Sequence, residues 1–153
     1  MKKILFATSE AVPFIKTGGL ADVAGSLPKC FDKKYFDIRV ILPKYACMKQ
    51  EWKDKMEYVT HFYMDLGYKN CYVGILQMEY DGIKFYFSGP KPYDSAPWDL
   101  EKFAFFSKAV LSVLPVIDFR PDIIHCHDWQ TGLVPVYLHD SFQQNQFFWG
   151  IKT

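Results

Sequence analysis

The 153-residue sequence predicts an α/β domain in which helices alternate with strands around a mostly parallel, Rossmann-like sheet. Residues 3–8 and 123–126 form short apolar runs, as a strand covered on both faces requires. A loop and then apolar residues at helical spacing follow each run, which is the order of a strand–loop–helix unit. Neither a repeat nor a low-complexity linker divides the chain, so we expect one domain.

The first unit begins with the strand at residues 3–8 and continues into a helix. The apolar residues that predict this helix have i, i+3, i+4, i+7 spacing: Leu20, Val23, Ala24 and Leu27. Small residues would let it lie close on the sheet: Ala21, Ala24 and Gly25. Pro28 should kink or shorten it. Residues 37–42 predict a second strand ended by Pro43, and residues 44–55 predict a short helix within a loop.

The middle of the chain changes character and predicts a β-hairpin insertion. Three segments are typical of strands: residues 58–65, 71–79 and 83–87. Asp81 and Gly82 separate the last two and suit a tight turn that needs positive φ. Residues 88–98 hold three prolines and a glycine, which predicts a loop.

A second strand–helix unit forms the C-terminal part. Asp99 can cap a helix whose apolar residues follow helical spacing: Leu100, Phe103, Phe106, Val110, Val113 and Leu114. Residues 123–126 predict a strand, and residues 131–139 predict the next helix. Residues 151–153 resemble the first residues of another strand.

Composition argues against several function classes. Lys and Arg number 18 against 17 Asp and Glu, and this near-neutral charge lacks the basic footprint of a nucleic-acid or anionic-membrane binder. The apolar run at the N-terminus is too short for a signal segment, and residues 109–119 are too short to span a bilayer. We therefore expect a soluble cytoplasmic protein. The four cysteines are scattered and are interpreted as small buried residues: Cys30, Cys47, Cys71 and Cys126.

Two loops are candidates for function, because ligands of open parallel sheets bind at the carboxyl ends of strands. The first holds Lys16, Thr17, Gly18 and Gly19 at the start of a helix. Glycines let backbone N–H groups approach a ligand and Lys16 adds a cation, which suits a phosphate or diphosphate. The order matches neither the P-loop nor the GxGxxG fingerprint. On spacing alone, a simple turn with a solvated lysine is an equally good interpretation.

The second loop holds His127, Asp128 and Trp129 directly after a strand. An imidazole, a carboxylate and an indole could bind sugar hydroxyls and sugar faces. Asp128 could instead be only a helix cap and Trp129 only a core residue. A metal site over residues 125–128 is disfavoured, because consecutive strand residues point to opposite faces.

Three blocks of sequence resemble one known family. Residues 3–23 (KILFATSEAVPFIKTGGLADV), 103–107 (FAFFS) and 121–133 (PDIIHCHDWQTGL) are similar to the N-terminal region of bacterial glycogen synthases and plant starch synthases, the family 5 glycosyltransferases. The resemblance covers essentially the whole chain.

The resemblance implies the N-terminal domain of a GT-B glycosyltransferase. Such an enzyme transfers glucose from ADP-glucose to the non-reducing end of an α-1,4-glucan, with retention of configuration and without a metal or other cofactor.

The resemblance also implies roles for individual residues. The first loop, which includes Thr17, would bind the nucleotide sugar. Lys16 would meet the phosphates, and Gly18 and Gly19 would leave room for the diphosphate. Asp22 would lie near the nucleotide sugar. Asp128 and Trp129, beside His127, would line the glucosyl pocket, where Asp128 could orient sugar hydroxyls or favour oxocarbenium character.

The sequence also departs from the family pattern. The family continues beyond residues 151–153 into a segment with a histidine that contacts the donor sugar, and then into a C-terminal Rossmann-like domain that supplies more cations. The resemblance therefore implies that residues 1–153 are a single, incomplete N-terminal domain without transferase activity of its own. The family also has additional residues between Phe87 and Ser88. Alternatives are a GT-B transferase that uses a UDP-sugar, a non-catalytic glucan-binding module with exposed aromatic residues, and a flavodoxin-like domain.

Overall fold

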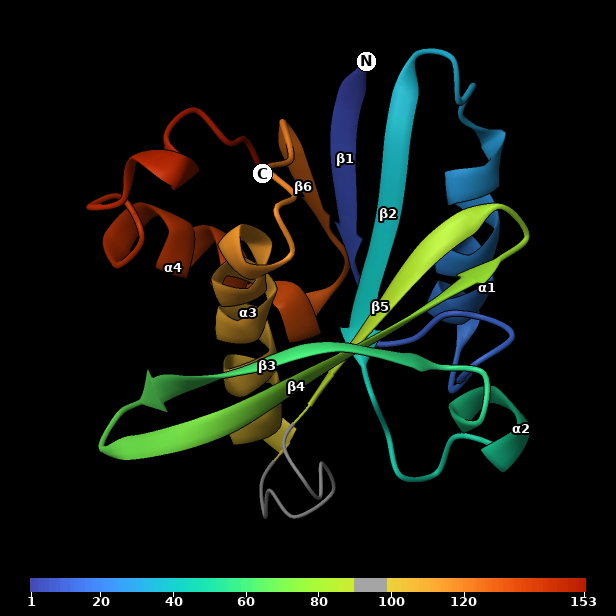
Figure 1. Cartoon of the computed structure of the whole chain (residues 1–153), viewed down its shortest axis with the longest axis horizontal. Helices are drawn as coiled ribbons and strands as arrows, with labels where there is room; N and C mark the ends of the chain where they lie inside the picture. The colour runs from blue at the N-terminus through green and yellow to red at the C-terminus, as the bar shows by residue number, and fades with distance from the viewer. Residues whose placement is uncertain (90–98) are drawn as a thin grey trace.

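The computed structural model describes residues 1–89 and 99–153, and it contains one six-stranded sheet (Figure 1). The strand order is β3-β4-β5-β2-β1-β6. The strands are β1 (Lys2–Ala7), β2 (Phe36–Pro43), β3 (Glu57–Leu66), β4 (Lys69–Tyr80), β5 (Ile83–Gly89) and β6 (Ile123–Cys126). The pairs β5–β2, β2–β1 and β1–β6 are parallel, whereas β4 is antiparallel to both of its neighbours. The predicted strands are confirmed, and β3 and β4 extend the same sheet.

Helices cover both faces of this sheet. They are α1 (Gly19–Ser26), α2 (Gln50–Lys53), α3 (Asp99–Val116) and α4 (Leu133–Asp140), with short 3-10 turns at η1 (Leu27–Cys30), η3 (Trp129–Thr131) and η4 (Gln146–Phe148). Helix α1 lies on one side of β1 and β2, and α3 and α4 lie on the other (Figure 1). Pro28 stands in η1, directly after α1, so the predicted shortening is confirmed. No helix in the described ranges is long and apolar enough to cross a membrane.

Helix α1 packs on the sheet through its small residues. Ala21, Ala24 and Gly25 are buried, and a Cβ added at Gly25 would lie 2.4 Å from Cγ2 of Val12. The face with these small residues is the buried one, whereas Val23, predicted on the buried stripe, is 48% exposed. The apolar spacing identified the helix correctly but assigned Val23 to the wrong face.

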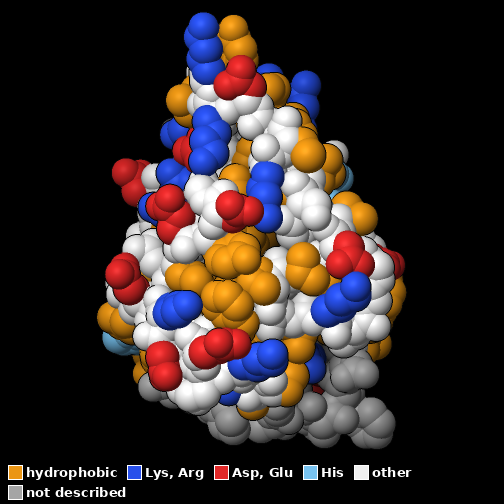
Figure 2. Space-filling view, turned by 90° about the vertical axis from the view of Figure 1, so that its right-hand side faces the viewer, with side chains coloured by type: hydrophobic (Ala, Val, Ile, Leu, Met, Phe, Trp, Pro, Cys, Tyr) orange, Lys and Arg blue, Asp and Glu red, His pale blue; other side chains and the backbone are white. Residues whose placement is uncertain are grey.

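The core fills both sides of the parallel strands. On the α1 side, the Phe14 ring meets Phe85 and Phe87 edge to face, at centroid distances of 4.9 and 5.1 Å. On the other side, Phe106 of α3 is fully buried. Figure 2 shows the face that carries α1 and α2, where hydrophobic side chains gather at the centre and charged ones surround them.

The β4–β5 turn has the predicted backbone, with φ of 53° at Asp81 and 75° at Gly82. The loop predicted from residue 88 is wrong at its start: β5 continues through Phe87, Ser88 and Gly89, because Ser88 pairs with Pro43 of β2. Residues 90–98 of that loop, and the cap predicted for the side chain of Asp99, lie outside the described residues.

Two smaller predictions have different outcomes. The prediction of four buried cysteines is wrong: Cys30 and Cys47 are exposed, and Cys71 and Cys126 are partly buried. The start of another strand after residue 150 is confirmed, since Lys152 makes an isolated parallel bridge to Ile123 of β6.

Candidate functional site

The two candidate loops lie side by side at the carboxyl edge of the sheet. They follow β1 and β6, which are parallel neighbours with Ala7 opposite Cys126. The pairing runs one residue past β6, where the N–H of His127 donates to the carbonyl of Ala7 at 3.1 Å. The chain leaves β1 toward β2 on one side and returns to β6 on the other, so this edge is a topological switch point, where open α/β sheets bind ligands.

A buried carboxylate, Glu10, organises the first loop from beneath. Glu10 is only 5% exposed. Its Oε2 accepts from the N–H of Thr17 at 2.6 Å and from the Thr17 hydroxyl. Oε1 accepts from the N–H of Ala21 in α1 at 3.1 Å. Glu10 therefore joins the loop at Thr17 to the first turn of the helix.

Lys16 and Asp22 form an ion pair on the surface of this loop. Nζ of Lys16 lies 2.7 Å from Oδ2 of Asp22, and both side chains are more than half exposed. Exposed pairs of this kind contribute on the order of 0–1 kcal/mol, so an anionic ligand could take the place of Asp22 at little cost. The structure brings these two predicted residues together.

Gly18 and Gly19 leave open space at the N-terminus of α1. A Cβ added at Gly19 would meet nothing within 4 Å, and one added at Gly18 would meet only Oε1 of Glu10, at 3.7 Å. No hydrogen bond found among the described residues uses the N–H of either glycine. Two free donors therefore stand at the positive end of a helix, which is an arrangement suited to a phosphate.

Asp128 and Trp129 present polar and apolar surface beside this loop. Asp128 has φ of 62°, unusual for a residue other than glycine, and its Oδ1 accepts from the N–H of Trp129 at 2.7 Å. The Trp129 ring is 57% exposed and rests edge to face on Phe103 of α3, at 5.3 Å between centroids. The predicted capping role of Asp128 is confirmed at η3, and the prediction that Trp129 is only core is wrong.

His127 points inward, unlike its two neighbours. It is 8% exposed, with ring centroids 5.2 Å from Phe6 and 4.2 Å from His125, and its Nε2 is buried without a hydrogen-bond partner in the described part of the chain. Burial, with a smaller contribution from the charge of His125, lowers the pKa of His127 from 6.5 to about 4. The imidazole is therefore neutral at pH 7 and packs against Phe6 and His125.

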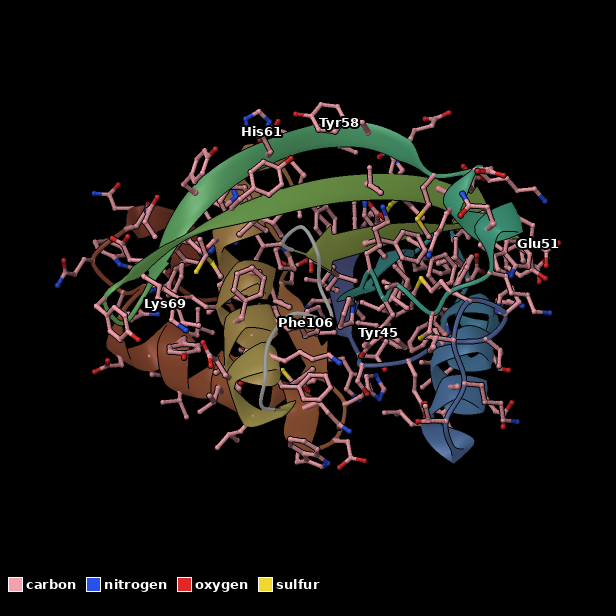
Figure 3. All side chains as sticks on the ribbon, turned by 90° about the horizontal axis from the view of Figure 1, so that it is seen from below. Tyr45, Glu51, Tyr58, His61, Lys69 and Phe106 are labelled. Carbon is pink, nitrogen blue, oxygen red and sulfur yellow. The ribbon has the colours of Figure 1, made fainter. Side chains whose placement is uncertain are left out.

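The sequence interpretation missed two residues of this edge. Glu10 lies three residues after the end of β1, and a carboxylate so close to a buried strand was a signal for a structural or functional role. Tyr45, after β2, donates its hydroxyl to the carbonyl of Ser9 at 2.7 Å and so holds the loop after β1 from a third side. Figure 3 shows Tyr45 beneath the sheet, between α1 and α3. Among residues 1–89 and 99–153, no three His, Cys, Asp or Glu side chains are grouped to hold a metal.

A mixed sheet with glycines at a helix N-terminus and an aromatic–carboxylate loop at its switch point is typical of open α/β domains that bind a ligand at this edge. The chain belongs to the family described as the starch synthase catalytic domain, whose pattern it matches over residues 3–153.

Individual relatives agree with this assignment. The chain is 65% identical to the glycogen synthase of Lachnoclostridium phytofermentans and 60% identical to that of Lachnospira eligens, in each case over 100% of the chain and 34% of the relative. It thus spans about a third of the length of the curated relatives it matches. The catalytic domain of starch synthase IV from Arabidopsis thaliana, solved with ADP and acarbose, superposes with a TM-score of 0.83 at 28% identity and covers 98% of this chain and 32% of that one. This fold similarity agrees with the predicted N-terminal, Rossmann-like part of a GT-B enzyme.

Proposed function

We propose that this chain forms the N-terminal side of the active site of a cytoplasmic glycogen synthase. The enzyme transfers glucose from ADP-glucose to the non-reducing end of an α-1,4-glucan, with retention of configuration and with no metal. The observation that carries the proposal is the meeting of the Lys16–Gly19 loop and the Asp128–Trp129 loop at one switch point. The family assignment and the ADP and acarbose bound by the plant relative support it.

The residues of the first loop suit the chemistry of the leaving group. Departure of ADP places negative charge on the diphosphate, and preorganised donors stabilise developing charge by roughly 3 kcal/mol each, by analogy with acyl-transfer sites. The free N–H groups of Gly18 and Gly19 are such donors. Lys16 would leave Asp22 and approach the phosphates as a mobile cation, and Asp22 would hold the lysine near the site when no ligand is bound.

The second loop suits the glucosyl group. The N–H of Trp129 donates to Oδ1 of Asp128 and so fixes the carboxylate. The other carboxylate oxygen of Asp128 is available to accept from a sugar hydroxyl. The exposed indole of Trp129, braced by Phe103, offers an apolar surface for a sugar face. A fixed carboxylate near the anomeric centre would favour oxocarbenium character, whereas His127 is buried against Phe6.

The proposed partner of this half-site is a C-terminal domain that supplies further cations for the diphosphate. The decisive material is a chimera in which this chain replaces the matching third of the Lachnoclostridium phytofermentans enzyme. We expect the chimera to incorporate glucose from ADP-glucose into glycogen, with an α-anomeric signal in NMR spectra of the product. We expect the isolated chain to incorporate none. A chimera that folds but prefers UDP-glucose, or transfers from neither donor, contradicts the proposal.

One observation favours a second role, as a glucan-binding module. Aromatic rings gather on the outer face of β3 and β4, where the Tyr63 and Tyr72 rings lie 5.7 Å apart and the His61 ring stacks on Tyr72 at 5.3 Å. Tyr58 and His61 point away from the body of the molecule in Figure 3. If this surface alone binds glycogen, retention of the chain on a glycogen gel falls in Tyr63→Ala and is unchanged in Lys16→Ala and Asp128→Ala.

A further inference from the structure

The cap of helix α1 comes from outside the helix. A helix N-terminus is normally capped by the side chain of its own N-cap residue, which accepts from the N–H two or three positions further on. Here the N-cap is Gly18, which has no side chain to do this. The N–H of Ala21, three positions further on, is bound instead by Oε1 of Glu10, eleven residues earlier.

This remote cap leaves the space in front of the N–H groups of Gly18 and Gly19 free of side chains. Gly18 has φ of −160° and ψ of −165°, an extended conformation that any residue adopts, so its backbone does not require glycine. A Ser or Asp there would cap the helix locally, but its side chain would occupy the space next to the free N–H groups. With Glu10 below the loop, the helix end is capped and the ligand side stays open.

Glu10 also fixes the loop that carries the cation. It accepts from both the N–H and the hydroxyl of Thr17, which lies between Lys16 and Gly18. Hydrogen bonds to a charged group are stronger than neutral ones, and the two carboxylate oxygens satisfy donors at both ends of a five-residue segment, Thr17 to Ala21. A glutamine at this position could accept with its one oxygen only. Its NH2 group would face a second donor and could not bind it.

We propose that Glu10 is the positioning residue of the diphosphate loop: it caps α1 remotely and fixes the backbone at Thr17, so that Gly18 and Gly19 can meet the nucleotide diphosphate. This inference rests on the proposed function. Glu10 acts through the loop, since its carboxylate is buried beneath it. Preorganisation of the donors lowers the cost of ordering the loop on binding.

The test compares three variants in the glycogen synthase chimera. Glu10→Gln removes the double acceptor, Glu10→Gln with Gly18→Asp returns a local cap to the helix, and Glu51→Gln makes the same change at an exposed position on α2, away from the site (Figure 3). The readouts are the Tm, the Kd for ADP from calorimetry, and separate KM values for ADP-glucose and glycogen.

We expect Glu10→Gln to raise the Kd for ADP and the KM for ADP-glucose roughly 10- to 100-fold, the range for losing one charge-assisted hydrogen bond, with the KM for glycogen changed less than twofold. The double variant should recover Tm without recovering ADP affinity. Glu51→Gln should match the unmodified chimera in every readout. Should Glu10→Gln fail to fold, Thr17→Val, which removes only the hydroxyl bonded to Oε2 of Glu10, carries the comparison of ADP affinity.

Three results would overturn the inference. The first is unchanged ADP affinity in Glu10→Gln. The second is tighter ADP binding, which would mean that the carboxylate acts mainly by repelling the phosphates. The third is recovery of ADP affinity together with Tm in the double variant, which would reduce Glu10 to a helix cap. An unmodified chimera without activity would instead refute the proposed function, so the two failures are distinguishable.

Discussion

Lowering the pH should destabilise this chain through one buried histidine. His127 has a pKa of about 4 in the folded chain, against 6.5 for an unperturbed histidine. Between these two pKa values, His127 is protonated in the unfolded state and neutral in the folded state, so protonation favours unfolding. The contribution of His127 to stability is complete above pH 6.5 and is lost as the pH falls toward 4.

The size of the effect follows from the two pKa values. A difference of about 2.5 units corresponds to roughly 3 kcal/mol below pH 4, of which about 2 kcal/mol is already lost at pH 5.

The assay is urea unfolding of the chain at intervals from pH 7.5 to 4.5. We compare it with His127→Phe, which keeps an aromatic ring against Phe6, and with His139→Gln, which removes an exposed histidine on α4. The wild type and His139→Gln should lose stability in parallel, and His127→Phe should lose about 2 kcal/mol less by pH 5. Identical slopes in all three would refute the reasoning.

Three further predictions concern the loop, the helix contact and the thiols. Lys16→Ala should weaken ADP binding about tenfold or more, yet change the free energy of unfolding by less than about 0.5 kcal/mol, because its ion pair is exposed; calorimetry and urea titration measure the two effects, and a large stability loss would contradict the assignment. Gly25→Ala should cost about 1–3 kcal/mol in urea unfolding, because the new Cβ would collide with Val12, whereas Gly19→Ala should leave stability nearly unchanged; equal costs would show that α1 shifts freely. Burial raises the pKa of the Cys126 thiol to about 11, so DTNB at pH 8 should label the exposed cysteines first, and equally fast reaction of Cys126 would disprove this.

The sequence was most informative where one residue type had one structural use. Pro28 marked the end of α1, and Asp81 with Gly82 marked a turn with positive φ at both positions. Continuous apolar runs identified β1 and β6, because strands buried on both faces tolerate little else. The parallel neighbours then placed the two candidate loops at one edge.

Features that depend on three-dimensional packing could not be predicted in the same way. Apolar spacing placed Val23 in the core, but the helix packs through Ala21, Ala24 and Gly25, with Gly25 close to Val12, and Val23 is exposed. The spacing of Lys16 and Gly19 said nothing about Glu10, whose bond to Ala21 joins residues eleven positions apart. His127 and Trp129 lie two positions apart in the sequence. Between them, Asp128 adopts a positive φ, and one ring points inward while the other points outward.

The position of β1 in the sheet has a consequence for how the chain is made. The strand is synthesised before both of its neighbours; β2 follows it closely, but β6 lies 119 residues later, since Ile4 pairs with Ile123 (123 − 4 = 119). Pairings of such separation form late, because closing a long loop costs entropy before the contact forms. During synthesis, the edge of β1 that pairs with β6 therefore stays unpaired until Ile123 has been made, and the two loops of the site come together only after that pairing.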